Sequence, residues 1–275
     1  MDFVNINGKL FRADEARISF DDRAFRYGDG LFETIKIRDG KILLEQFHFE
    51  RLLQGLQVLK FETDELFLAE KLKAEIIRLC EKNNCIEECR VRLTISRGSG
   101  SLQEFHNHFN IVIEASPIKN QEQSASIAID IFPDARKSCD IYSNLKTSNF
   151  LPYVMAAKFA IENQLDDCLV LNIHGRICDS TISNIFWIKD KEIFTPPLSE
   201  GCVAGVMRRW MLEKVQGTRY KVQERVCESA DLKNADEIFL TNVIRGIRPV
   251  NRFKDQSYRA DVTNSLIETT QKLIL

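Results

Sequence analysis

The sequence lacks a long hydrophobic run and has no excess of charge of either sign. No uninterrupted apolar stretch reaches the roughly 18 residues that a membrane-spanning helix needs. With 38 basic and 40 acidic residues the formal net charge is -2, so electrostatics give no reason to expect a nucleic acid or a membrane surface as a partner. The first residues, MDFVNINGKLF, lack the basic and then apolar pattern of a secretory signal, and we expect a cytoplasmic protein.

The cysteines lack the spacing of a disulfide framework or a metal site. Eight of them are spread along 275 residues, and we expect them to remain reduced thiols. Only Cys80, Cys85 and Cys89 cluster, at a spacing that is not a usual zinc pattern and with no histidine close in sequence. We therefore expect no metal site and interpret the three as buried or half-buried thiols near the end of a helix.

Two motifs of nucleotide-binding and cofactor-binding folds are also missing. The glycines of RLTISRGSGS are not followed by the Gly-Lys-Ser/Thr of a P-loop, so a turn is the simplest interpretation. The alternative is a backbone anion nest, or Arg97 turned toward an anion. Strands and helices do not alternate in the regular order that would predict a doubly wound parallel sheet.

What the first part of the chain does contain is short strands, tight turns and two amphipathic helices. FVNINGKLF and LFETIKIRDGKILL each enclose an Asn-Gly or Asp-Gly pair, which predicts two hairpins. Leucines on one face predict a helix over residues 46–59, and Asp64 is placed to cap a second helix that extends to about residue 82. CRVRLTIS and NIVIEA are typical of strands.

The polar segment SPIKNQEQSAS indicates a domain boundary. We predict an N-terminal α/β domain over residues 1–118, a linker over 119–125 and a C-terminal α/β domain over 126–275. In the C-terminal domain we expect helices near residues 151–163, 204–215 and 262–273, and strands at IAIDIF, CLVLN, NIFWI, EIFT and DEIFLTN. The fold class is therefore α/β of the α+β type, with two domains and mixed sheets covered by helices.

Several segments could carry chemistry, although each is weak alone. Lys146 stands among small polar residues in SNLKTSNF, where an exposed charge is the ordinary interpretation. Glycines in LSEGCVAGVMRRWM precede a helical run, and the bare N–H groups of a helix start attract anions, although a junction without a ligand is simpler. Arg51 would ordinarily be a charge on a helix surface, and Asp179 a turn or capping residue.

Taken together, these segments resemble the class IV aminotransferase family, the pyridoxal phosphate enzymes of fold type IV. The similarity covers nearly the full chain, in the order of the family's motifs. It rests on YGDGLFET (27–34), HFERL (48–52), ISRGSG (95–100), LKTSN (145–149), CDSTISNIFW (178–187), GCVAGVMR (201–208) and TNVIRGIRPV (241–250).

The resemblance implies a cofactor, pyridoxal 5'-phosphate, and roles for particular residues. Lys146 matches the Schiff-base lysine, and Asp179 matches the acid beside the pyridine nitrogen. The phosphate ligands would be the Arg51 guanidinium, the backbone N–H groups of Val206 and Met207, and the turn Asn242–Val243, while Arg97 is the candidate for a substrate carboxylate. The family normally has glutamate in place of Asp179, and many of its aminotransferases have threonine in place of Val243. The shorter Asp179 would need a backbone shift or a water molecule to make the same contact.

Within the family, the chain is most similar to aminodeoxychorismate lyases, which release pyruvate from 4-amino-4-deoxychorismate and form 4-aminobenzoate, a folate precursor. This interpretation rests on ISRGSG, on the spacing of Lys146 and Asn149, on GVMR, and on Asn242 before an apolar pair.

The alternative activity is that of an amino-acid aminotransferase that uses 2-oxoglutarate. Glu33, which aminotransferases also carry, favours it. Branched-chain enzymes usually place the asparagine one residue further from the lysine, and SLQEFHNH lacks the Arg-x-His of D-amino-acid enzymes. A third hypothesis is a cofactor-binding module without turnover. The family is dimeric, so the resemblance also implies a homodimer.

Overall fold

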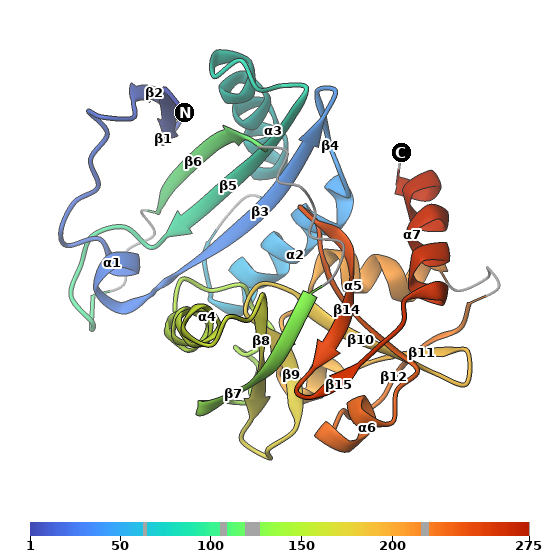
Figure 1. Ribbon diagram of the computed structural model, residues 1–275. Helices are drawn as coiled ribbons and strands as arrows, with labels where there is room; N and C mark the ends of the chain where they lie inside the picture. Colours follow the sequence, from blue (N-terminus) through green and yellow to red (C-terminus); the bar gives the residue numbers. More distant parts are fainter. Residues whose placement is uncertain (63–64, 105–108, 119–126, 216–219, 275) are drawn as a thin grey trace. The chain divides into compact units, whose positions relative to one another are not determined.

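The computed structural model describes residues 1–62, 65–104, 109–118, 127–215 and 220–274 (Figure 1). The chain divides into two compact units, which are described separately. Unit 1 comprises Met1–Gln121 and Lys146–Phe150, and unit 2 comprises Glu122–Leu145 and Leu151–Leu275. The expected linker, residues 119–125, and the expected helix cap Asp64 lie outside the described residues. Lys146–Phe150 belongs to unit 1, whereas the division expected from the sequence placed these residues in the C-terminal domain.

Unit 1 is built on a six-stranded antiparallel sheet in the order β2-β1-β6-β5-β3-β4. Its strands are β1 (Phe3–Ile6), β2 (Lys9–Arg12), β3 (Gly30–Arg38), β4 (Lys41–Ile42), β5 (Glu88–Ser96) and β6 (Asn110–Pro117), and its helices are α1 (Arg23–Tyr27), α2 (Glu45–Val58) and α3 (Glu65–Lys82). Both predicted hairpins are confirmed: Asn7-Gly8 and Asp39-Gly40 have the positive φ angles that a tight primed turn requires. The two predicted helices correspond to α2 and α3.

Unit 2 contains a nine-stranded mixed sheet in the order β12-β11-β10-β13-β14-β7-β8-β9, with β15 paired to β14. The strands are β7 (Ile127–Lys137), β8 (Asp167–Asn172), β9 (Ile177–Ser180), β10 (Asn184–Lys189), β11 (Glu192–Thr195), β12 (Val222–Glu224), β13 (Glu237–Asn242), β14 (Gly246–Phe253) and β15 (Gln256–Ser257). The helices are α4 (Leu151–Glu162), α5 (Val206–Trp210), α6 (Ser229–Lys233) and α7 (Asp261–Ile274), and α5 continues into a π-helical turn, Met211–Val215.

The central strands of unit 2 are buried on both faces. In β10 and β13 nearly every side chain is buried, as expected where helices and loops cover both sides of a sheet. Trp187 packs on one face with Ile238 and Phe253, whereas Phe186 and Phe239 stack on the other with ring centroids 5.0 Å apart. The fold class predicted from the sequence, a mixed α+β arrangement with two sheets, is confirmed. Within the described residues, no helix combines the length and apolarity needed to cross a membrane.

A buried carboxylate joins the sheet of unit 1 to helix α2. Glu33 of β3 is 2% exposed and accepts hydrogen bonds from Arg51 through Nε (2.8 Å) and Nη2 (2.6 Å). The Nδ1 atom of His48 lies 2.7 Å from the same carboxylate. Burial alone would raise the pKa of Glu33, but the neighbouring Arg51 cation and the contacts with His48 lower it from 4.5 to about 2. The carboxylate therefore stays ionised and fixes the orientation of Arg51.

This buried ion pair predicts a pH-dependent contribution to stability. Because the pKa of Glu33 is lower in the folded state than in the unfolded state, its stabilisation is complete above about pH 4.5 and is lost as the pH falls toward 2. Glu33→Gln should reduce the free energy of unfolding by about 3 to 5 kcal/mol at pH 7, because it removes the buried negative charge that pairs with the Arg51 guanidinium. Urea unfolding of both proteins from pH 7 to pH 3 measures the difference, which should shrink at low pH. The control is Glu162→Gln on the exposed face of α4, which should change little. A difference that stays constant over the whole range would contradict this account.

Candidate active site

In unit 1, Lys146 lies on a short extended segment that pairs with β3. The backbone N–H of Phe32 donates to the carbonyl of Lys146 and that of Ser148 to the carbonyl of Gly30, both at 2.9 Å. The Lys146 side chain is half-buried, and its Nζ lies 4.4 Å from the ring centroid of Phe32 and 5.7 Å from that of Phe150. The amine is therefore held against aromatic faces, which is unlike the ordinary surface lysine that SNLKTSNF alone would suggest.

Two glycines of YGDGLFET allow three motif segments to meet in unit 1. Gly28 has a φ of 70°, and a Cβ atom there would lie 3.1 Å from the Cβ of Asn149. A Cβ atom on Gly30 would lie 2.6 Å from the carbonyl oxygen of Ile95, a distance that real structures do not tolerate. The glycines thus bring LKTSN and Ile95, the first residue of ISRGSG, close to the same stretch of backbone, so motifs far apart in sequence share one place in the fold.

Arg97, the candidate for a substrate carboxylate, is held by contacts within unit 1. Its Nε donates to Asp29 at 3.0 Å, its Nη2 donates to the carbonyl of Leu59 at 2.6 Å, and its guanidinium lies over the Phe61 ring. The residue is 8% exposed. A substrate carboxylate would have to compete with Asp29 for this guanidinium, so the role of Arg97 stays a prediction that these contacts do not favour.

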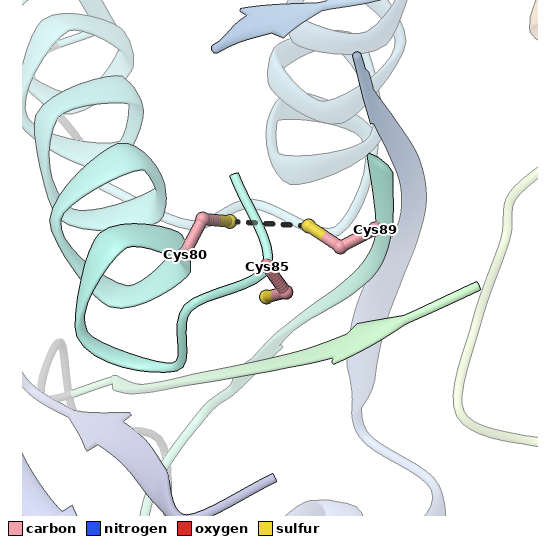
Figure 2. A group of neighbouring side chains, drawn as sticks. All are labelled: Cys80, Cys85 and Cys89. Atoms are coloured by element: carbon pink, nitrogen blue, oxygen red, sulfur yellow. Dashed lines mark hydrogen bonds between the residues drawn. The ribbon is translucent and has the colours of Figure 1, made fainter. Parts of the chain in front are cut away.

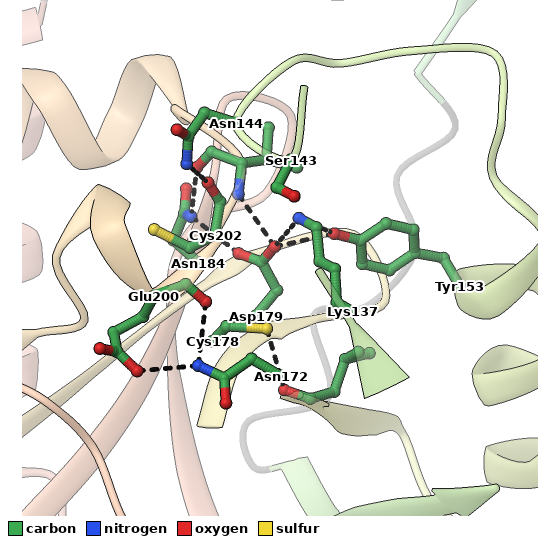
Figure 3. Close-up of polar contacts among 12 residues, drawn as sticks. Lys137, Ser143, Asn144, Tyr153, Asn172, Cys178, Asp179, Asn184, Glu200 and Cys202 are labelled. Atoms are coloured by element: carbon green, nitrogen blue, oxygen red, sulfur yellow. Dashed lines mark hydrogen bonds and ion pairs between the residues drawn. The ribbon is translucent and has the colours of Figure 1, made fainter. Parts of the chain in front are cut away.

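In unit 2, the carboxylate of Asp179 is the centre of a buried polar network (Figure 3). Asp179 is 2% exposed. Its Oδ2 accepts from Lys137 Nζ at 3.0 Å, Tyr153 Oη at 2.8 Å and the Val203 backbone N–H at 2.9 Å. Its Oδ1 accepts from Asn184 Nδ2 at 3.1 Å. Asp179 is therefore not the turn or capping residue that it would ordinarily be, but an ionisable group held by four donors from four other segments.

The start of helix α5 is shaped by close contact with Asn184. A Cβ atom on Gly205 would lie 1.8 Å from Asn184 Oδ1, so a side chain at this position would displace Asn184. Gly205 is also the N-cap residue of α5 and provides no side-chain cap. The first N–H groups of a helix have no partner inside the helix, and those of Val206 and Met207 are therefore suited to an anion.

The turn at Asn242–Val243 is rigid, and a buried hydroxyl precedes it. Asn242 Oδ1 accepts from the backbone N–H groups of Ile244 at 3.1 Å and Arg245 at 2.8 Å, which fixes the turn. The Oγ1 atom of Thr241 is buried and has no hydrogen-bond partner among the described residues. An unpaired buried hydroxyl is unfavourable unless a further group satisfies it. Unit 2 thus offers a buried carboxylate, which can accept from a ring nitrogen, and an uncapped helix start, whose N–H groups can donate to a phosphate. These groups fit a cofactor that carries a phosphate and a basic ring nitrogen.

Sequence reasoning did not identify four residues of this site, namely Lys137, Tyr153, Asn184 and Thr241. Asn184 lies inside the quoted motif CDSTISNIFW, which could have drawn attention to it. Lys137 and Tyr153 have no such signal, because they reach Asp179 from 42 and 26 residues away.

The three clustered cysteines of unit 1 lie side by side at the end of α3 and the start of β5 (Figure 2). Their Sγ atoms are all within 4.8 Å of one another, and those of Cys80 and Cys89 are 3.4 Å apart. Burial raises the pKa of Cys85 to about 12, so this group is a neutral thiol at physiological pH. Structural zinc takes four ligands, and the cluster has three members among the residues that the structure describes. The arrangement agrees with the interpretation of these residues as buried thiols.

Comparison with known proteins gives the same family as the motifs. The model of the class IV amino-transferases matches residues 30–253. The chain is 29% identical over 248 residues to an aminodeoxychorismate lyase of Vibrio harveyi, covering 86% of this chain and 88% of the relative. It is 24% identical over 283 residues to a D-alanine aminotransferase of Staphylococcus epidermidis, covering 98% and 95% of the two chains. A branched-chain aminotransferase from Thermoproteus uzoniensis has the same fold, with a TM-score of 0.90, 22% identity, and coverage of 99% and 94%. The resemblance is thus confirmed: the chain belongs to the class IV aminotransferase family and is a pyridoxal-phosphate-dependent enzyme.

Proposed function

We propose that the enzyme is a 4-amino-4-deoxychorismate lyase, which releases pyruvate and forms 4-aminobenzoate for folate precursor synthesis. The observation that carries this proposal is the 29% identity, over 86% of the chain, to a relative named aminodeoxychorismate lyase. The spacing of Lys146 and Asn149 in LKTSN supports it, because branched-chain aminotransferases usually place this asparagine one residue further from the lysine.

Glu33, the residue that favoured an aminotransferase, is compatible with either activity. Its carboxylate contacts Arg51 and His48 inside unit 1 and is 2% exposed. Because it holds an arginine that we propose as a phosphate ligand, its role belongs to cofactor binding, which both activities share. Glu33 therefore does not count against the lyase.

We propose that Lys146 forms the covalent attachment to the cofactor and that Asp179 binds the ring nitrogen. The proposed phosphate ligands are Arg51, the N–H groups of Val206 and Met207, and the turn Asn242–Val243. The bound cofactor supplies an electron-withdrawing ring that stabilises negative charge on the substrate carbon. Asp179 suits its role because it is buried, ionisable and held in place by neutral and cationic donors. Arg51 suits its role because Glu33 fixes its Nε and Nη2 edge.

The protein's part in the reaction is proton transfer by Lys146. With the cofactor bound, Lys146 Nζ would take the proton from the substrate carbon that bears the reacting amine. In the lyase, this proton would pass to the departing three-carbon group, which leaves as pyruvate while the substrate ring becomes aromatic. In an aminotransferase, Lys146 would move the same proton, the cofactor would keep the amino group, and water would release the keto acid. The residues that we assign to the cofactor serve both reactions.

The second candidate function is an amino-acid aminotransferase that uses 2-oxoglutarate, of the branched-chain or the D-amino-acid type. The similarity to a D-alanine aminotransferase at 24% identity over 98% of the chain favours it. The two histidines of SLQEFHNH, at positions 106 and 108, lie outside the described residues.

We further propose that the enzyme is a homodimer in the cytoplasm. Helix α4 exposes an apolar stripe, formed by Leu151, Val154, Met155 and Ile161, with exposed fractions between 42% and 78%. An exposed apolar stripe on a helix is typical of a surface that another protein covers, and a second copy fits the dimeric habit that the resemblance implies. All eight cysteines are free thiols, which suits a reducing compartment.

The lyase activity is tested by product formation from 4-amino-4-deoxychorismate. The protein loaded with pyridoxal 5'-phosphate should form 4-aminobenzoate and pyruvate in equal amounts. Lys146→Ala should lower the rate by about three orders of magnitude, because the proton-transferring amine is lost. It should also abolish the trapping of the cofactor on the peptide around residue 146 by borohydride, which mass spectrometry detects. Lys221→Ala, a change at an exposed lysine before β12, is the matched control and should leave both properties unchanged.

Three outcomes would contradict parts of this proposal. Amine transfer from branched-chain L-amino acids or D-alanine to 2-oxoglutarate, without 4-aminobenzoate, would favour the aminotransferase. No product from any of these substrates, with the cofactor loaded, would favour a binding module without turnover. Trapping of the cofactor at another lysine would refute the assignment of Lys146.

The dimer is tested by placing a charge in the apolar stripe of α4. Val154→Lys should shift the molar mass measured by light scattering from that of a dimer toward that of a monomer, because burying a lysine at an interface is unfavourable. Ile173→Lys introduces the same charge at an exposed isoleucine in the turn after β8 and should leave the dimer intact. A wild-type protein that is monomeric at micromolar concentration would refute the proposal.

A further inference from the structure

Lys137 and Tyr153 converge on one oxygen of Asp179 (Figure 3). Lys137 is the last residue of β7, and its side chain is 12% exposed. Tyr153 lies in α4 and is 7% exposed. The lysine Nζ and the tyrosine Oη are 2.6 Å apart, and both contact Asp179 Oδ2. Neither residue belongs to the motif segments that identify the family.

The two oxygens of Asp179 are used unequally. Oδ2 accepts from three donors, namely Lys137, Tyr153 and the N–H of Val203, whereas Oδ1 accepts from Asn184 alone among the described residues. A carboxylate has about four acceptor positions, two on each oxygen. The three donors on Oδ2 exceed its two positions and leave it no room for a further partner, whereas Oδ1 keeps one acceptor position.

We propose that Lys137 and Tyr153 are positioning residues that hold Asp179 by Oδ2 and direct Oδ1 to the ring nitrogen of the cofactor. Through its charge, Lys137 also sets the proton affinity of this ring nitrogen. The inference rests on the proposed role of Asp179 and deepens it. It also accounts for the shorter side chain at this position. Donors from β7 and α4 hold the aspartate in one orientation, which answers the need for a fixed contact without a longer side chain.

Lys137 acts on the bound cofactor through its charge as well as through its hydrogen bond to Asp179. Burial and the charge of Asp179 raise the pKa of Tyr153 well above its usual range, so the phenol remains protonated and donates. Lys137 is the cation among the described contacts of Asp179. When a protonated ring nitrogen binds to Oδ1, two cations share one carboxylate, and each lowers the affinity of the other for its proton. Lys137 should therefore keep the pKa of the cofactor's ring nitrogen lower than it would be with Asp179 alone.

The experiment is a pH titration of the visible absorbance of the bound cofactor. This absorbance follows the protonation of the nitrogen that joins Lys146 to the cofactor, which is conjugated with the ring and therefore senses the charge at Asp179. Lys137→Met removes the charge and keeps the length of the side chain, so the midpoint should rise by about one pH unit. Lys137→Arg keeps the charge and should leave the midpoint near that of the wild type. Tyr153→Phe should weaken cofactor binding with a smaller change in midpoint, because it removes one neutral donor. Lys221→Met, at an exposed lysine before β12, is the control for the loss of a lysine.

Lys137→Gln covers the case in which the methionine variant does not fold, because glutamine retains a donor for Oδ2. It should show the same rise of the midpoint as Lys137→Met. A wild-type midpoint in either neutral variant, with full cofactor content, would overturn the inference while leaving the cofactor assignment intact. A wild-type protein in which no visible absorbance follows addition of the cofactor would overturn the proposed function and, with it, this inference. A fall in melting temperature without a change in midpoint would show that Lys137 is structural only.

Discussion

The arrangement of unit 2 depends on the hydrogen bonds that the buried carboxylate of Asp179 accepts. It joins β9, which carries it, to the end of β7, to α4, to β10 and to the loop before α5. A buried charge is strongly unfavourable unless it is paired and fully hydrogen-bonded, and here Lys137 provides the counter-charge. Because Asn184 also contacts Gly205 closely, the group that holds the carboxylate sets the start of α5 as well. The proposed phosphate ligands at the start of α5 are therefore linked to one buried carboxylate through Asn184.

Unit 1 uses the same physical device. Glu33 is buried on β3 and holds Arg51 and His48 of α2, just as Asp179 holds its donors. In both units, a buried carboxylate fixes the cationic or polar groups that surround it, so these groups do not have to be ordered when a ligand binds. This preorganisation fits an enzyme that must hold a charged cofactor in one orientation.

Sequence reasoning predicted the features that local chemistry determines. The hairpins followed from Asn7-Gly8 and Asp39-Gly40, and the long helices α2 and α3 followed from their leucine spacing. The five-residue helices α1 and α6 are too short for periodicity to show, and the π-helical end of α5 has no sequence signal. The pairing of the Lys146 segment with β3, and the convergence of Lys137 and Tyr153 on Asp179, are contacts between distant parts of the chain, which only the fold creates.

The central claim, that Asp179 binds the ring nitrogen of pyridoxal 5'-phosphate, is tested most directly by nitrogen NMR. The enzyme is loaded with cofactor that carries ¹⁵N in the pyridine ring, and the chemical shift of this nitrogen is measured at pH 7. The account predicts the shift of a protonated ring nitrogen hydrogen-bonded to a carboxylate, and a move toward the unprotonated value in Asp179→Asn. A wild-type enzyme that binds the cofactor with an unprotonated ring nitrogen would contradict it.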